Sequence, residues 1–329
     1  MHSDPSHEGR DAASPWAMPL VAWKQVAVRT YKEASADNVG LIAAGVGFYA
    51  FLALVPLLGA VVLTYGLVVK IDTVMRDMQA LTAIMPADIA KLIGDQLLGV
   101  VQTSGGKKGI GLFIALGVAL FGARNAAGAI VTALNIAYEE EEKRGFIKVN
   151  LLALAMTGGA VVAVVFALLA VTAFGHLGAL LPSAGPIAIA AGKVLAYVLV
   201  AVVAASAAAI IYRFGPSRDR ARWTWLTPGS AFFAIAWVIL TLGFGFYVAR
   251  FGNYGATYGS LGAVVVLLTW LYLSSYTLLF GAELNSELEH QTARDTTKGP
   301  DRPLGERGAW AADHVAQGEV AGKPAGEPG

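Results

Sequence analysis

Cysteine is absent from this sequence of 329 residues, and charged residues are scarce, making up 14% of it. Without cysteine, the chain has no disulfide, no thiolate metal ligand and no cysteine nucleophile. The scarcity of charge excludes more, because soluble domains contain about 25% charged residues and need polar side chains to cover their surface. Since 56% of the residues are hydrophobic and the mean hydropathy is +0.59, the composition predicts a membrane protein.

A large net charge is also missing, because the formal net charge is only +1. Domains that bind nucleic acids carry a strongly basic surface that neutralises phosphates, so we expect no nucleic acid partner. We also expect no cleaved signal peptide, since acidic residues such as Asp4, Asp11 and Glu33 occupy the first forty positions and no apolar core follows a basic start.

Motifs of soluble enzymes are missing as well. The sequence contains neither the phosphate-binding pattern GxxxxGK[ST] nor the serine pattern GxSxG. The acidic run Glu139–Glu142, followed by Lys143 and Arg144, is interpreted as a solvated loop. We therefore predict that the chain is not an enzyme, has no cofactor or metal and does not hydrolyse ATP through a P-loop. The histidines are scattered without a metal-ligand spacing, at His2, His7, His176, His290 and His314.

Six apolar runs dominate what is present. Each is long enough to cross a hydrocarbon core of about 30 Å, which takes about 20 helical residues. The runs are continuously apolar and lack the alternation of a membrane β-barrel, so helices are favoured. The sequence predicts an all-α, polytopic membrane bundle of six transmembrane helices. The predicted spans cover about 41–69, 110–138, 149–174, 186–212, 226–249 and 258–282.

Lysine and arginine in the flanks predict the orientation of these spans. With an even number of spans, the two termini and two of the five loops share one side of the membrane. That side holds sixteen Lys and Arg residues and the other side holds six. Because positive residues accumulate on the cytoplasmic side, the bias predicts that both termini lie inside.

The predicted spans divide the chain into three parts. Residues 1–37 form a cytoplasmic segment, residues 38–288 the membrane domain and residues 289–329 a disordered tail rich in Gly, Pro and charge. In the first external loop, 71–102 shows the spacing of amphipathic helices. In the first segment, an apolar helical face predicts a helix in the membrane interface, with a short solvated helix as the alternative. That face contains Trp16, Leu20, Trp23, Ala27 and Tyr31.

Arg124 is the most unusual residue of the predicted spans. It follows Ile110 by 14 residues, which places it about 21 Å along a helix, near the bilayer centre. A charge there costs about 2.5–3.5 kcal/mol on insertion scales. Asn125 is adjacent and Asn135 lies closer to the cytoplasm. One interpretation is an anion or headgroup contact in a cavity of the bundle, and the other is a structural arginine tied to helix-end carbonyls or to a carboxylate.

The last span supplies the remaining candidate substrate-binding residues. Glu283 and Asn285 close it at the cytoplasmic edge, and Tyr258 stands at its external start in a glycine-rich turn. A cytoplasmic gate is the functional interpretation of Glu283, and an ordinary interfacial charge is the alternative. For the turn at Tyr258, close helix packing competes with a broken helix that lines a cavity.

Four pieces in a fixed order carry a family resemblance. With them, the chain resembles the YihY/virulence factor BrkB family of bacterial inner-membrane proteins from about Ala34 to Glu287. The pieces are GFYAFLALVPLL (Gly47–Leu58), the polar pair followed by Ala133, Leu134, Asn135 and Tyr138, the W-x-x-P-G of Trp225, Pro228 and Gly229 with Trp237 and Tyr247, and YGSLG…GAELN from Tyr258 to Asn285.

The resemblance implies six transmembrane helices in a bacterial inner membrane and a transport or envelope-related role. Members of the family were once labelled ribonuclease BN, a label that fits poorly with the missing metal-ligand cluster. We expect a transporter or flippase-like protein for a small or lipid-linked, anionic substrate of the envelope, with membrane lipids as partners and the oligomeric state left open. The alternative is a non-transporting structural or interaction protein of the envelope.

Overall fold

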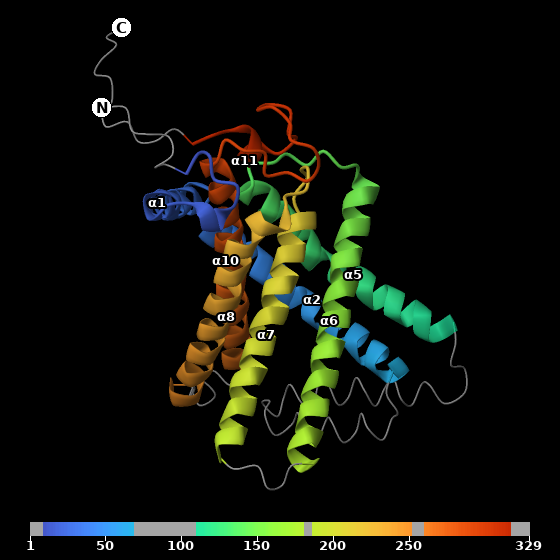
Figure 1. Ribbon diagram of the computed structural model, residues 1–329. Coiled ribbons are helices and arrows are strands. Elements are labelled where there is room, and N and C mark those ends of the chain that lie inside the picture. The colour runs from blue at the N-terminus through green and yellow to red at the C-terminus, as the bar shows by residue number, and fades with distance from the viewer. Residues whose placement is uncertain (1–8, 69–109, 181–185, 252–259, 317–329) are drawn as a thin grey trace.

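Helices make up most of the computed structural model, which describes residues 9–68, 110–180, 186–251 and 260–316 (Figure 1). Within these ranges there is no strand, only an isolated bridge between Ala221 and Thr297. The predicted all-α fold is therefore confirmed. The long helices are α1 (Leu20–Ala36), α2 (Val39–Val68), α5 (Ile110–Ala137), α6 (Phe146–Leu180), α7 (Pro186–Phe214), α8 (Trp223–Phe251) and α10 (Ser260–Gln291), and the short ones are η2 (Pro15–Ala17) and α11 (Trp310–Asp313).

The described part of each of the six predicted apolar runs lies in one long helix. Among the described residues, four helical segments are long and apolar enough to cross a membrane, in α5, α6, α8 and α10. A fifth is added if α1 and α2, which meet at a bend of 65°, count as one span. The apolar segment Val198–Phe214 of α7 is shorter. The structure thus supports a membrane protein, and the count of six spans stays a prediction, as does the loop 71–102, which lies outside the described residues.

The helices are not all parallel. In Figure 1, α2 and α5 run obliquely across α6 and α7. Small residues allow the close approaches: a Cβ on Gly122 of α5 would lie 3.3 Å from the Cβ of Pro56 in α2. On the other side of α2, a Cβ on Gly47 would lie 3.1 Å from the backbone nitrogen of Tyr272 in α10. Such small residues let membrane helices pack backbone to backbone.

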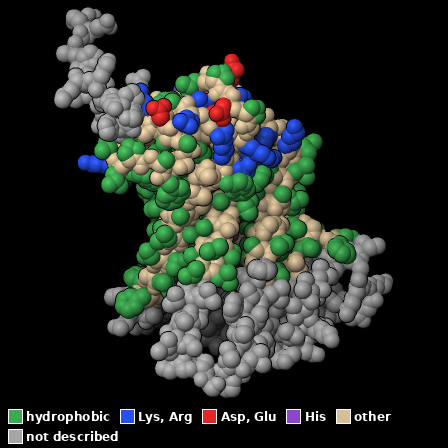
Figure 2. Space-filling model, in the orientation of Figure 1, with side chains coloured by type: hydrophobic (Ala, Val, Ile, Leu, Met, Phe, Trp, Pro, Cys, Tyr) green, Lys and Arg blue, Asp and Glu red, His purple; other side chains and the backbone are tan. Residues whose placement is uncertain are grey.

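One end of the bundle gathers most of the polar residues. It contains α1, the turn 138–145 between α5 and α6, the turn 215–222 between α7 and α8, and the segment 292–316. Lys and Arg side chains cover this end, whereas the surface along the helices is mostly apolar (Figure 2). We call it the polar end.

Helix α1 exposes the apolar face that was predicted to lie in the membrane interface. Leu20 is 86% exposed and Tyr31 is 68% exposed. The opposite face, with Ala22, Val26 and Thr30, is buried against the rest of the polar end. An exposed apolar face of this kind is what an interfacial helix requires.

The segment 292–316 is folded, which differs from the disorder predicted from residue 289 onwards. Its Thr292 hydroxyl donates to the carbonyls of Arg10 and Ala12, at 3.0 and 2.9 Å. Arg307 is 4% exposed and donates to several backbone carbonyls, that of Ala312 at 2.6 Å among them. Composition predicts disorder where apolar burial is insufficient, and it misses an arginine that orders a loop by satisfying its carbonyls.

Candidate anion-binding pocket

The described residues among the predicted site residues fall in two places. Asn135, Glu283 and Asn285 are buried at the polar end. Arg124 and Asn125 lie about three turns before Asn135 in α5. Tyr258, the remaining one, lies outside the described residues.

Arg124 is held by the start of α6. Its Nη1 donates to the Oδ1 of Asn150, and its guanidinium lies 4.4 Å from the ring centre of Phe121. Asn150 stands one turn after the first residue of α6, Phe146, and its amide donates to the carbonyl of Phe146 at 2.8 Å. Counting residues along α5 predicts mid-membrane depth only if that helix is parallel to the bundle axis, and α5 is oblique (Figure 1). The contact with Asn150 is neither a helix-end carbonyl nor a carboxylate, and the Nε of Arg124 is buried without a hydrogen-bond partner. Both interpretations of Arg124 therefore stay predictions.

Asn285 joins α10 to α8. Its Oδ1 accepts the backbone N–H of Gly229 at 2.8 Å, and its Nδ2 donates to the carbonyl of Leu226 at 3.3 Å. The two backbones touch here, because a Cβ on Gly281 would lie 2.8 Å from the carbonyl oxygen of Gly229. Two of the family-like sequence pieces, W-x-x-P-G and GAELN, thus form the two sides of one helix contact.

Asn135 joins the two turns of the polar end. Its Oδ1 accepts the backbone N–H of Ser217 at 2.7 Å, and its Nδ2 donates to Glu142 at 3.0 Å. Glu142 also accepts hydrogen bonds from Arg144, at 2.7 and 2.6 Å. Those bonds from Arg144, with a further one from Asn135, lower the pKa of Glu142 to about 2. Turn 138–145 is therefore fixed against turn 215–222.

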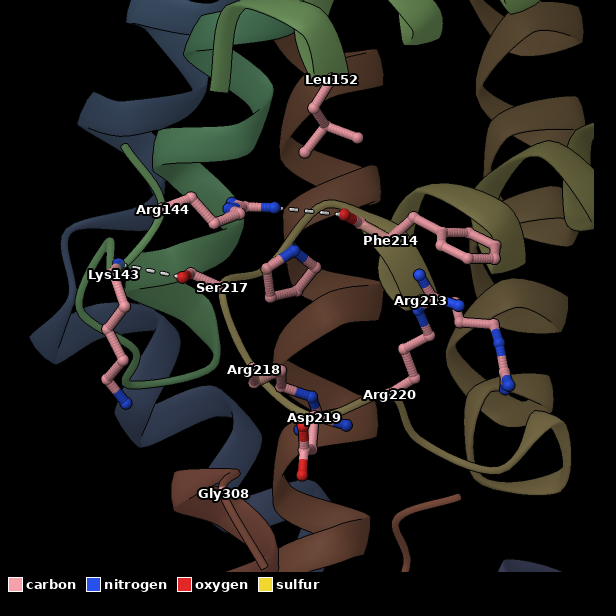
Figure 3. Close-up of a pocket in the computed structure, with 11 residues that line it drawn as sticks. Lys143, Arg144, Leu152, Arg213, Phe214, Ser217, Arg218, Asp219, Arg220 and Gly308 are labelled. Atoms are coloured by element: carbon pink, nitrogen blue, oxygen red, sulfur yellow. Dashed lines mark hydrogen bonds between the residues drawn. The ribbon is translucent and has the colours of Figure 1, made fainter. Parts of the chain in front are cut away.

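A pocket of about 520 Å³ opens between these turns (Figure 3). Its lining combines five cationic side chains with the apolar side chains of Leu152 and Phe214. Leu152 comes from α6, on the side of the helices, and Gly308 comes from the folded C-terminal segment on the opposite side. The cationic residues are Lys143, Arg144, Arg213, Arg218 and Arg220.

Two of these arginines are engaged by the protein itself. Arg144 bonds to Glu142 and also donates to the carbonyl of Gly215 at 2.8 Å. Arg213 donates to the carbonyl of Ala221 and lies over the ring of Trp223 at 4.4 Å. Both side chains shape the walls of the pocket and hold its turns in place.

Arg218 has donor capacity to spare. Its Nη2 binds Glu289 at 2.6 Å, and the side chains of this pair are 1% and 0% exposed. The guanidinium also lies over the ring of Tyr138 at 4.5 Å. Its Nη1, however, is buried without a hydrogen-bond partner. A buried guanidinium N–H without a partner is costly, and Arg218 is one of the residues that line the pocket.

The folded C-terminal segment forms the rim of the pocket. The backbone N–H of Asp219 donates to the carbonyl of Gly308 at 2.9 Å, and Arg302 binds the Asp219 carboxylate at 2.6 Å. On the turn after α5, Glu140 accepts the backbone N–H of Trp310 at 2.7 Å. The segment therefore borders the pocket through bonds to both turns.

From the sequence alone, the pocket arginines were considered only as part of the positive charge of the loops. A more local pattern was present in Arg213–Arg220, where three arginines fall within eight residues directly after an apolar run, with Asp219 between the last two. Such a pattern could have suggested a headgroup site at a membrane surface. The partner turn 138–145 lies far away in the sequence, and only the fold brings the two turns together.

Comparison with known proteins gives a family match over most of the chain. The sequence profile described as virulence factor BrkB matches residues 30–305. The putative ribonuclease-like protein YfkH of Bacillus subtilis is 30% identical over 246 residues, which cover 69% of this chain and 87% of that protein.

Shorter matches connect the chain to proteins named only as membrane proteins. A UPF0761 membrane protein of Tolumonas auensis is 32% identical over 78 residues, covering 24% of this chain and 26% of that protein. A UPF0761 membrane protein of Xanthomonas campestris pv. campestris is 39% identical over 79 residues, covering 24% of this chain and 18% of that protein. No solved structure matches the chain.

Proposed function

The chain belongs to the virulence factor BrkB family, and from that premise we propose that it transports an anionic amphiphile across a bacterial inner membrane. The substrate class is a lipid or lipid-linked molecule with a phosphate headgroup, bound at the basic pocket. The protein is multi-pass, with its polar end in the cytoplasm, and works as a transporter or flippase without an ATPase of its own.

The observation that carries this proposal is the unpartnered Nη1 of Arg218 in a pocket with an apolar side. Guanidinium groups match phosphate oxygens in geometry and charge. Leu152 and Phe214 give the same pocket an apolar surface next to the helices, as an acyl or polyprenyl chain requires. The combination suits a molecule with one anionic end and one apolar end.

The position of the pocket supports the same substrate class. It lies at the polar end, where Lys and Arg side chains gather above the apolar helix surface (Figure 2). Positive residues favour the cytoplasmic side of a bacterial membrane, and they attract anionic lipids there. A headgroup can thus reach the pocket from the adjacent leaflet.

Reconstitution into lipid vesicles tests the proposal. We expect the wild-type protein to speed the movement of a fluorescent phosphatidylglycerol between leaflets. This movement is measured by quenching the label of the outer leaflet with dithionite. Arg220→Glu reverses a charge on the pocket lining, and Lys148→Glu makes the same change at an exposed site in the first turn of α6, outside the pocket. A lost charged hydrogen bond is worth about 1.5–3 kcal/mol, so R220E should slow the movement about tenfold or more and K148E should not.

The alternative is a non-transporting envelope protein that binds lipids or partners at its polar end. The folded segment 292–316 favours it, because this segment adds an ordered surface beside the pocket. Binding of phosphatidylglycerol without movement between leaflets, measured on the same vesicles, would support this alternative over transport. Equal rates for R220E and K148E would contradict a role of the pocket in movement.

A further inference from the structure

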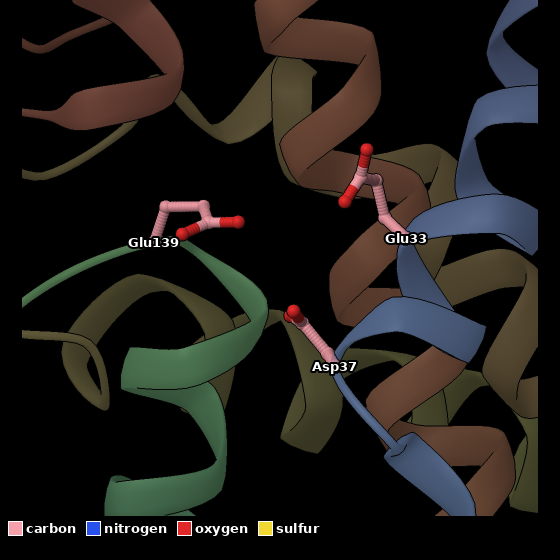
Figure 4. A group of neighbouring side chains, drawn as sticks. All are labelled: Glu33, Asp37 and Glu139. Carbon is pink, nitrogen blue, oxygen red and sulfur yellow. The ribbon is translucent and has the colours of Figure 1, made fainter.

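Three carboxylates from two distant parts of the chain meet at the polar end (Figure 4). Glu33 belongs to the last turn of α1, Asp37 to the junction of α1 and α2, and Glu139 to the turn after α5. One carboxylate oxygen of each lies within 4.8 Å of those of the other two. We call these residues the carboxylate cluster.

A fourth carboxylate, buried in α10, faces this cluster. Glu283 is 2% exposed, and its carboxyl group contacts that of Asp37. Its Oε1 is buried and has no hydrogen-bond partner. A buried carboxyl group is normally hydrogen-bonded, neutral or bound to a metal ion. Glu283 shares a hydrogen bond with Asp37, and its Oε1 is left without a partner.

The positive groups near the cluster are bonded directly to another carboxylate. Glu287, one turn along α10, adds negative charge and is the partner of Arg29 and His290, whose charges also reach Glu33. Arg29 binds Glu287 through Nε at 2.5 Å and Gln291 through Nη2 at 2.6 Å. His290 lies 3.7 Å from the same Glu287 carboxylate.

The most exposed member of the cluster is Glu139. Its backbone is left-handed, with φ of 55°, a conformation uncommon for a residue other than glycine. The fold thus keeps three carboxylates together, and a positive ion among them would offset their repulsion.

We propose that Glu33, Asp37 and Glu139, backed by Glu283, bind a hard divalent cation. Ca²⁺–oxygen distances of about 2.3–2.6 Å allow the ligand oxygens of one Ca²⁺ to lie up to about 5.2 Å apart, and the cluster oxygens, within 4.8 Å of one another, meet this limit. The shorter Mg²⁺–oxygen distance of about 2.0–2.1 Å requires them to approach to about 4.2 Å. The donors are all oxygens, which suits Mg²⁺, Mn²⁺ or Ca²⁺ better than zinc or copper. Glu139 is exposed, so water can complete the coordination, as Mg²⁺ and Mn²⁺ usually require.

The cation would join three elements that otherwise meet through like charges. It would tie the α1–α2 junction and the end of α5 to α10. This site is separate from the basic pocket and does not depend on the transport proposal.

Binding of Mn²⁺ to the purified full-length protein after chelator treatment tests the site. We expect one saturable site by electron paramagnetic resonance, competed by Mg²⁺, and a rise in melting temperature when the ion is added. Glu139→Gln should weaken the binding at least tenfold. Glu141→Gln removes one negative charge from the same turn, at an exposed residue outside the cluster, and should change it less than twofold.

A second variant separates loss of the site from loss of the fold. Asp37→Asn should weaken Mn²⁺ binding while raising the melting temperature in chelator, because one repelling charge is gone. Absence of saturable Mn²⁺ binding to the wild-type protein would overturn the proposal. Equal weakening by E139Q and E141Q would overturn it too, since only the general surface charge would then matter.

Discussion

The basic pocket and the carboxylate cluster share the polar end and the turn 138–145, yet they treat their charges differently. In the pocket, Arg144 and Arg213 are bonded to carboxylate or carbonyl oxygens of the protein, and spare capacity is concentrated at Arg218. In the cluster, carboxylates face one another and the buried Glu283 lacks a partner for one oxygen. One turn therefore contributes cationic side chains to the pocket and a carboxylate to the cluster.

Breaking the buried ion pair of the pocket should have the largest effect. Glu289→Gln leaves Arg218 charged in a position where its side chain is 1% exposed. Losing one partner of a buried pair costs about 3–5 kcal/mol. We expect a large drop in the melting temperature in detergent, or loss of the monodisperse peak in size-exclusion chromatography. A melting temperature equal to wild type would show that the pair does not hold the pocket.

Cutting the link between the two turns should have a smaller effect. Asn135→Ala removes the acceptor for the Ser217 N–H and the donor to Glu142. Each buried group left without a partner costs about 1–3 kcal/mol. Unfolding by chaotrope should therefore begin at a lower concentration than for wild type. The control Asn125→Ala changes an exposed asparagine of the same helix and should leave the midpoint unchanged.

The pH dependence should differ with and without cation. Partial burial raises the folded-state pKa of Glu139, so the folded protein binds more protons than the unfolded one between the two pKa values. Unfolding free energy then falls as the pH rises through that window. In chelator, the melting temperature should decrease from mildly acidic to neutral pH, and E139Q should flatten this slope. If E139Q and wild type show the same slope, a group other than Glu139 causes the pH dependence.

Neutralising an exposed charge near both regions should have the smallest effect. Lys148→Gln at the start of α6 removes a charge that lies outside the pocket and the cluster. Such surface changes usually stay within about 0.5 kcal/mol. Thermal melts in detergent should show curves for K148Q and wild type that nearly coincide.

The helices were predictable from the sequence, and the polar end was not. Runs such as 110–138 and 186–212 are apolar throughout, so local composition alone sets their helical state. The depth of Arg124 stays a prediction, because residue counting gives a position along a helix and carries no information on tilt. Asn285 was predicted as a site residue. Its hydrogen bond with Gly229 could not be predicted from the sequence, because the two residues are 56 positions apart in the chain.

Long-range pairing also explains why the site itself was missed. Arg218 and Glu289 are 71 residues apart, and Glu33 meets Glu139 only because α1 folds back beside the end of α5. Charges counted loop by loop correctly indicated a basic end. Such counts cannot tell Arg213, which is bonded to a backbone carbonyl, from Arg218, whose Nη1 has no hydrogen-bond partner.

A density map of the protein in phosphatidylglycerol nanodiscs would test the central claim most directly. The account predicts headgroup density in the basic pocket, with a phosphate oxygen within hydrogen-bond distance of Arg218 Nη1 and an acyl chain beside Leu152. A pocket without lipid, in which a protein oxygen bonds to Nη1, would contradict it.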